Sequence, residues 1–205
     1  MRYWGNDIVA LGDPNFQKED HLQRWLNKVC TKEEKDMLFS SNQMHMARWR
    51  LWSCKESVYK VLIKSGVSPF LNPLRIEVVP DEPWDKEQMR FKAIFDGRKI
   101  GGCSFKKDHW VHSISSNQPF TGHDYHSEII KVAEKSASEQ IRVLVKKKLE
   151  KEHDIKVENI FQSSLNIPTI ICQDKEIGVD FSISHHAPYS AYILHIYNRL
   201  SLNDI

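Results

Sequence analysis

The chain has 205 residues, of which 40% are hydrophobic and 27% are charged, and its formal net charge is +2. This composition is typical of a soluble globular protein and excludes a disordered chain. The small net charge gives no support to a nucleic-acid partner, and no apolar run is long enough to span a bilayer. We therefore expect a protein that binds neither nucleic acid nor a membrane.

The four cysteines, Cys30, Cys54, Cys103 and Cys172, are scattered without C-x-x-C spacing. Such cysteines are typically buried free thiols in a reducing compartment, whereas zinc ligands are usually clustered. Residues 1–7 also lack the hydrophobic region of a signal peptide. These features predict a cytoplasmic protein.

The first predicted elements are a strand and two helices. Residues 2–11 have a strand pattern with Asp7 in its interior, and Gly12-Asp13-Pro14 ends it. An acid inside a strand needs a partner if it is buried; the alternative is an exposed edge or turn position. An amphipathic helix is predicted from the spacing of Phe16, Leu22, Trp25, Leu26 and Val29, and a short helix with the Thr31–Glu34 capping-box pattern runs through Phe39.

A long helix is predicted from Asn42 to Ser65, and Gly66 ends it by adopting a left-handed conformation. One stripe of this helix is apolar and is the ordinary buried face: Leu51, Cys54, Val58, Val61 and Leu62. The opposite stripe holds Trp49, Trp52, Glu56 and Lys60. Glu56 and Lys60 could form no more than a surface ion pair, but the two indoles beside them indicate a stripe that protein or ligand covers.

Strands make up the rest of the first half. We predict a strand over residues 74–79, a loop over 80–84, and a hairpin in which Asp96-Gly97 joins 89–95 to 99–105. A further strand over 110–115 completes an antiparallel meander.

The second half has the same composition of elements, with a long helix over 127–153 that is followed by four strands. These strands are predicted over 155–161, 169–172, 179–184 and 189–197. The sequence therefore predicts an α+β fold of two pseudo-symmetric lobes, residues 1–117 and 118–205. Each lobe is a long helix packed on a small antiparallel sheet, with a cleft between the lobes.

Charged residues of the first half and a Ser-His pair of the second predict the chemistry of this cleft. Asp7 and Glu56 supply carboxylates, and Lys55 and Lys60 lie near Glu56 in the sequence. Two carboxylates suit a hard divalent cation that keeps waters for a phosphate to replace, and lysines neutralise charge that develops on phosphate transfer. Ser184-His185 at a strand end could donate hydrogen bonds to an anion; a hydrated strand end is the alternative. The residues predict a metal- and phosphate-binding cleft.

Three segments resemble the motifs of the 4'-phosphopantetheinyl transferases. Gly5-Asn6-Asp7 is similar to the family's G-x-D strand, and Trp52-Ser53-Cys54-Lys55-Glu56-Ser57-Val58-Tyr59-Lys60 to its W/F-x-x-K-E-S/A-x-x-K helix. Phe181-Ser182-Ile183-Ser184-His185 resembles its S-x-S-H strand. The implied reaction transfers phosphopantetheine from coenzyme A to a serine hydroxyl of an apo acyl or peptidyl carrier protein and releases adenosine 3',5'-bisphosphate.

The resemblance also implies residue roles. Asp7 and Glu56 would bind Mg²⁺, Glu56 would take the serine proton directly or through a water, and Lys60 would stabilise the leaving phosphate. Lys55 would help to position the phosphates of coenzyme A. Ser184 and His185 would contact its 3'-phosphate end, and the other lobe would cover the two indoles of the long helix.

The order of the lobes departs from the family pattern. In two-lobe members the S-x-S-H lobe comes first, whereas here it follows, and Asn166-Ile167-Pro168 resembles the G-K-P turn of that lobe. We interpret the chain as a monomer with swapped lobes and a site within one chain. The alternative is a single-lobe enzyme with a long insertion, which builds its site between the subunits of a homo-oligomer.

A second departure concerns the metal ligands. Val9 stands where two-lobe members commonly have a third acid, so the metal would rest on two carboxylates and water. This keeps open a catalytically weak or inactive protein that binds coenzyme A. Another metal-dependent phosphate enzyme, such as a nuclease that uses Asp7, Glu56 and Lys60, is the third interpretation.

Overall fold

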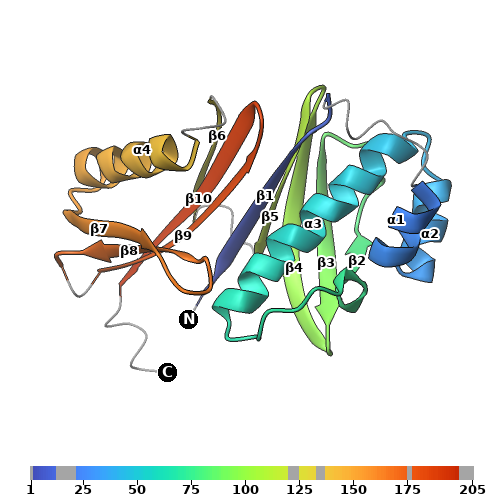
Figure 1. Cartoon of the computed structure of the whole chain (residues 1–205), viewed down its shortest axis with the longest axis horizontal. Coiled ribbons are helices and arrows are strands. Elements are labelled where there is room, and N and C mark those ends of the chain that lie inside the picture. The colour runs from blue at the N-terminus through green and yellow to red at the C-terminus, as the bar shows by residue number, and fades with distance from the viewer. Residues whose placement is uncertain (1, 13–21, 120–124, 133–136, 175–176, 199–205) are drawn as a thin grey trace.

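The protein forms two lobes that lie side by side (Figure 1), as seen in a computed structural model that describes residues 2–12, 22–119, 125–132, 137–174 and 177–198. The first lobe contains β1 (Trp4–Ala10), α1 (Leu22–Val29), α2 (Lys32–Phe39), α3 (Met44–Lys64), the 3-10 turn η3 (Pro73–Arg75), β2 (Glu77–Pro80), β3 (Gln88–Phe95), β4 (Arg98–Lys107) and β5 (Trp110–Ser116). The second contains β6 (His126–Lys131), α4 (Ala137–Glu152), β7 (Val157–Gln162), β8 (Pro168–Cys172), β9 (Ile177–His186) and β10 (Tyr189–Asn198). Each lobe places a long helix on antiparallel strands, which confirms the predicted α+β class.

The first lobe is a five-stranded sheet in the order β1-β5-β4-β3-β2, with α3 packed on one face. The apolar stripe that was predicted for the long helix is buried in the core of this lobe. Asp96 and Gly97 both have positive φ angles, 47° and 79°, and form the predicted hairpin between β3 and β4. The capping box between Thr31 and Glu34 is also present at the start of α2. One strand prediction is shortened: residues 73–75 form η3, so β2 begins only at Glu77.

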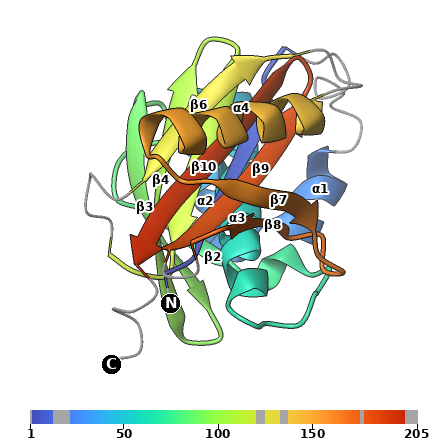
Figure 2. The same ribbon diagram turned by 90° about the vertical axis from the view of Figure 1, so that its left-hand side faces the viewer.

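The second lobe places α4 across the three-stranded sheet β6-β10-β9 (Figure 2), with β7 and β8 as a separate pair. Ile141, Val145 and Leu149 of α4 are buried against this sheet, as predicted from their spacing. The prediction of helix from residue 127 is wrong, because residues 126–131 form β6 and pair with β10. Without β6, this edge of β10 would expose unpaired backbone groups, so tertiary pairing overrides the local helical pattern.

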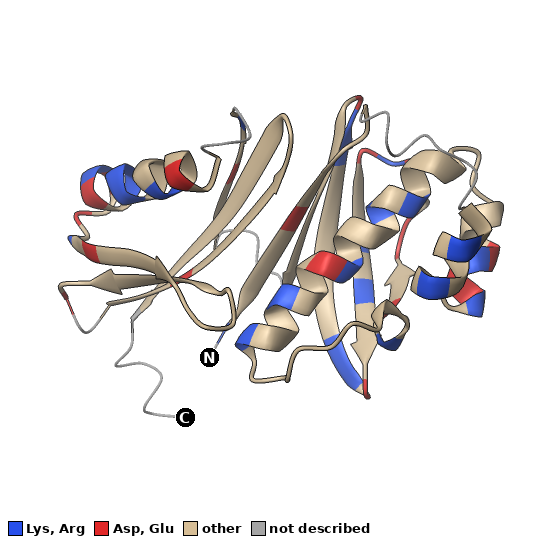
Figure 3. Cartoon of the chain, in the orientation of Figure 1, with Lys and Arg blue, Asp and Glu red and all other residues tan. Residues whose placement is uncertain are grey.

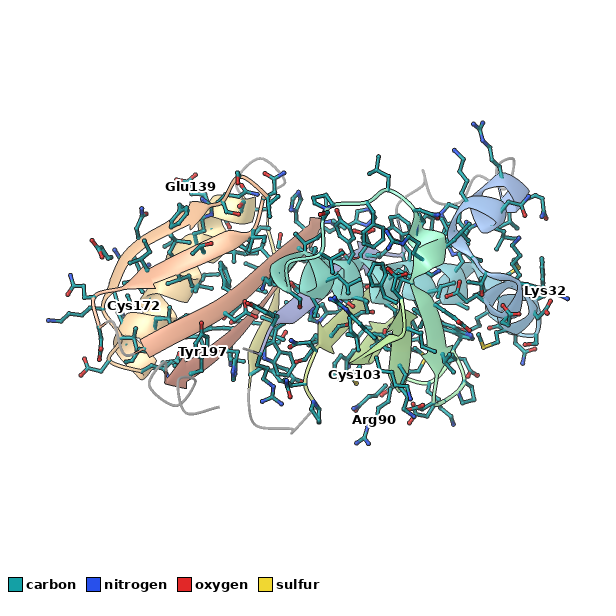
Figure 4. All side chains as sticks on the ribbon, turned by 90° about the horizontal axis from the view of Figure 1, so that it is seen from below. Lys32, Arg90, Cys103, Glu139, Cys172 and Tyr197 are labelled. Carbon is teal, nitrogen blue, oxygen red and sulfur yellow. The ribbon has the colours of Figure 1, made fainter. Side chains whose placement is uncertain are left out.

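The predicted free, buried state of the cysteines is confirmed. All four cysteines are free and buried, and Cys103 and Cys172 lie in different lobes (Figure 4). Within the described ranges, no helix has the length and apolarity that a membrane span requires. The predicted helix position Phe16 lies outside the described residues.

The lobes meet where β1 runs beside β9. Backbone N–H groups of Trp4, Asn6 and Ala10 donate to side chains of Asp180, Ser182 and His186, respectively. Each of these pairs is 176 residues apart, so the two strands run parallel. Side chains of β9 therefore satisfy backbone donors on the edge of β1 that faces away from β5.

Gly5 allows the close approach of β1 to α3. A Cβ atom at this position would lie 2.1 Å from the carbonyl oxygen of Ser57 and 3.1 Å from Lys60 Cβ. The oxygen of Ser57 is a backbone atom, and Cβ of Lys60 is fixed directly to the helix backbone, so neither atom can rotate away. The glycine of the G-x-D motif therefore sets the distance between strand and helix.

We expect Gly5→Ala to destabilise the protein by about 1–3 kcal/mol, because the added methyl group forces β1 away from α3. Urea unfolding measures this change. Gly12→Ala is the matched control, since no atom lies within 4 Å of a Cβ there, and its stability should change by no more than about 0.5 kcal/mol. Equal stability of the two variants would contradict the packing argument.

His112 of β5 is buried at the junction of the lobes, and its Nε2 atom lies 3.3 Å from Nδ2 of Asn6. Burial, assisted by the positive charge of Lys60, lowers the pKa of His112 from 6.5 to about 3. The folded protein therefore holds this imidazole neutral at pH values where the unfolded chain is protonated.

We expect acidification below about pH 6.5 to remove stability through His112, by roughly 1.4 kcal/mol per pH unit, because only the unfolded chain binds the proton. Asp7 acts in the opposite direction, since its pKa is raised from 3.8 to about 7 and the folded chain takes up that proton. The informative quantity is therefore the difference in unfolding free energy between the unaltered protein and His112→Gln. This difference should shrink as the pH falls, and a constant difference would contradict the assignment.

Candidate active site

Asp7 of β1 and Lys60 of α3 come together because α3 packs along β1. The Nζ atom of Lys60 lies 2.7 Å from the backbone oxygen of Asn6 and 3.4 Å from Oδ1 of Asp7. In Figure 3 the acidic segment of β1 lies next to the acidic segment of α3, and basic segments follow towards the end of the helix. Glu56 supplies that acidic position, one helical turn before Lys60.

The two carboxylates are electrostatically coupled. Burial raises the pKa of Asp7 to about 7; the ammonium of Lys60 opposes this shift, and the charge of Glu56 adds to it. Burial also raises the pKa of Glu56, again against the effect of Lys60. Two carboxylates held close together in a poorly solvated place are stabilised in their charged forms by a cation.

The donor set fits a hard cation with few protein ligands. Among the residues that the structure describes, no group of three or more His, Cys, Asp or Glu side chains could hold a metal ion. Val9, at the position of the missing third acid, is 3% exposed and belongs to the buried hydrophobic residues. Asp7 and Glu56 are thus the two carboxylates that could hold a cation here, and such a pair would suit Mg²⁺, because this ion commonly binds one or two carboxylates, waters and substrate phosphates.

Lys55 does not join this group, which corrects its predicted role at the phosphates. Its side chain is 1% exposed, and its Nζ atom lies 2.7 Å from Oε2 of Glu34. The same ammonium donates to the backbone oxygens of Val29 and Pro73. Consecutive helix residues point about 100° apart, so Lys55 faces α2 while Glu56 faces the cleft. Sequence reasoning identified Glu34 only as a capping residue and missed this buried ion pair.

The indoles of the long helix are covered within the first lobe, which corrects the expectation that the second lobe covers them. The ring of Trp49 meets that of Trp25 of α1 edge-on, with 5.6 Å between the ring centres. Trp52 is half-buried and packs against the core of the first lobe. The two indoles therefore serve packing, as expected for a covered helix face. Trp49 packs on α1 and Trp52 on the core of the same lobe.

Ser184 and His185 are adjacent in β9 but face opposite sides of the strand. The hydroxyl of Ser184 is buried and accepts a hydrogen bond from Nδ2 of Asn6 over 3.0 Å. His185 is exposed. The structure thus brings Ser184 to the G-x-D strand of the same chain, whereas the imidazole of His185 lies on the outer side of β9.

A cavity of about 350 Å³ lies between the lobes, and Glu56 and Lys60 line it. Its walls come from α3, from the turn between β7 and β8, and from β9. They include Glu56, Tyr59, Lys60, Ile63, Lys64, Asn166, Ile167, Pro168, Ser182 and Ile183. The predicted cleft is therefore present. Glu56, Lys60 and Lys64 of α3 line one side of it, and residues 166–168, the turn that resembles G-K-P, line the other.

Comparison with known proteins agrees with the geometry. No curated protein matches the chain. The family model of the 4'-phosphopantetheinyl transferase superfamily matches residues 4–114, more than half of the chain, a range that runs from the start of β1 into β5 and includes α3. The chain therefore belongs to the 4'-phosphopantetheinyl transferase superfamily.

Proposed function

We propose that this protein transfers 4'-phosphopantetheine from coenzyme A to a serine of an apo acyl or peptidyl carrier protein in a Mg²⁺-dependent reaction. The observation that carries the proposal is the cavity between the lobes, into which Glu56 and Lys60 face, with Asp7 in contact with Lys60. Superfamily membership supports phosphopantetheinyl transfer in general. The buried free thiols fit a cytoplasmic enzyme.

In this reaction the serine oxygen forms a bond to the β-phosphorus of coenzyme A, and the pyrophosphate P–O bond breaks. Glu56 accepts the serine proton, directly or through a water. Lys60 stabilises the negative charge that passes to adenosine 3',5'-bisphosphate. Asp7 and Glu56 would hold Mg²⁺, which would supply positive charge at the pyrophosphate when bound.

Coenzyme A is assigned to the cleft between the lobes. We assign residues 1–117 to the lobe that carries Asp7 and Glu56, and residues 118–205 to the lobe that carries Ser184 and His185. His185 would contact the 3'-phosphate end of the substrate through its exposed imidazole, whereas the buried hydroxyl of Ser184 would position β9 beside Asn6. Because β9 lies beside β1 of the same chain, the site needs no second subunit, which supports the monomer with swapped lobes.

The test is incubation with Mg²⁺, coenzyme A and an apo carrier protein, followed by mass measurement of the intact carrier. We expect the carrier to gain one phosphopantetheine group. Glu56→Gln should slow transfer by about 10²–10⁴-fold, because the base is lost while the side-chain volume is kept. Glu139→Gln, an exposed acid on α4 (Figure 4), is the control and should transfer at the normal rate.

A protein that binds coenzyme A without transfer is the second candidate, and the buried Val9 in place of a third acid favours it. Calorimetry separates the two. Binding of coenzyme A without mass gain on any carrier tested would support the binding protein, and equal transfer by Glu56→Gln would remove Glu56 from the mechanism.

A further inference from the structure

Lys64, one helical turn after Lys60, closes the junction of the lobes. Its Nζ atom lies 2.7 Å from Oδ1 of Asp180, 2.6 Å from the backbone oxygen of Trp4 and 2.9 Å from that of Phe181. The other carboxylate oxygen of Asp180 accepts the N–H of Trp4. Lys64 is only 4% exposed and Asp180 only 11%. The backbone N–H and C=O of Trp4 are thus both bound by the Lys64–Asp180 ion pair, which joins α3 to β9.

Lys60 repeats this arrangement one step along the same strands. Its ammonium contacts the backbone oxygens of Asn6 and Ile183, at 2.7 and 3.4 Å. Four residues of helix advance about 6 Å, and two residues of strand advance roughly 6.6 Å. The spacing of Lys60 and Lys64 along α3 therefore matches the step from Asn6 to Trp4 along β1. Both ammonium groups bind carbonyl oxygens of the same two strands, β1 and β9.

The side chains of Lys60 and Lys64 differ in solvent exposure. The Lys60 side chain is 28% exposed and lies beside Asp7, whereas Lys64 is buried and fully engaged with oxygen acceptors. Lys60 contacts Ile183 of β9 only through one bond of 3.4 Å, which cannot hold β9 in place by itself. The Lys64–Asp180 pair has the charge, the short distances and the burial to do so.

We propose that Lys64 and Asp180 are positioning residues that form a latch between the lobes, setting the width of the coenzyme A cleft and the place of the Lys60 ammonium. The cleft has one wall on α3 and another on β9, and Lys64 and Ile183 both line it. Without the latch, β9 moves away from α3, and the cavity between them widens. The effect on coenzyme A rests on the proposed function; the effect on the lobe junction does not.

The first measurement needs no substrate. Amide hydrogen exchange is followed at Asn6, whose N–H donates to Ser182 and touches neither latch residue. Lys64→Met and Asp180→Asn should each raise the exchange rate of this amide at least tenfold, and Lys64→Arg, which keeps the charge and the donors, should restore it substantially. An unchanged rate at Asn6 in both variants would overturn the latch, whatever the enzyme does.

The second measurement separates positioning from mere stability. Val145→Ala removes buried volume from α4, away from the junction, and serves as a control for a destabilised second lobe. We expect Lys64→Met and Asp180→Asn to raise the KM for coenzyme A at least tenfold, with the KM for the carrier changed less than twofold, whereas Val145→Ala changes neither. Equal changes in both KM values, or the same rise in Val145→Ala, would overturn the positioning role. If the unaltered protein transfers nothing, the proposed function fails and the hydrogen-exchange result alone decides the latch.

Discussion

The outer edge of β1 is the constraint on which the rest of the structure depends. A strand edge that is buried between two lobes must find partners for its backbone groups, or it loses free energy for each one left unpaired. Among the strands that the structure describes, none pairs with that edge. Side chains of β9 accept its N–H groups, and lysines of α3 donate to its carbonyl groups. The lobes are therefore joined through side chains rather than through a continuous sheet.

Residues of the candidate site also take part in joining the lobes. Lys60 is assigned to the leaving phosphate, yet its ammonium also satisfies the carbonyl of Asn6. Asn6 itself donates to Ser184 of the S-x-S-H strand. The residue between the glycine and the acid of the G-x-D motif thus connects both signature segments of the site, so a change in lobe packing is transmitted directly to the charged groups of the cleft.

The correction for Lys55 has a similar cause. Its neighbour in the motif, Glu56, faces the cleft, while Lys55 is neutralised by Glu34 in the interior. A buried ammonium needs such a partner, because desolvation otherwise makes its charged form costly. The adjacent acid and base of the K-E motif therefore lie in two different regions: Glu56 lines the cleft, and Lys55 attaches α3 to α2 and to the segment before β2.

The amino-acid sequence by itself determined the local elements and supplied the motif residues from which the candidate site is proposed. The apolar stripe of α3, the Asp96-Gly97 hairpin and the Thr31–Glu34 cap depend on interactions within a few residues, so periodicity and turn chemistry were enough to predict them. Asp7, Glu56 and Lys60 were predicted from the chemistry of their side chains and from the family resemblance, and the structure places Lys60 in contact with Asp7. Tertiary structure alone decided that residues 126–131 form a strand, that Lys55 is buried and that Lys64 meets Asp180, because each of these depends on a partner far away in the chain. The spacing of residues along the chain does not indicate such distant partners. In the folded protein, the backbone N–H and C=O groups on the outer edge of β1 require hydrogen-bond partners, and residues of β9 and α3 supply them.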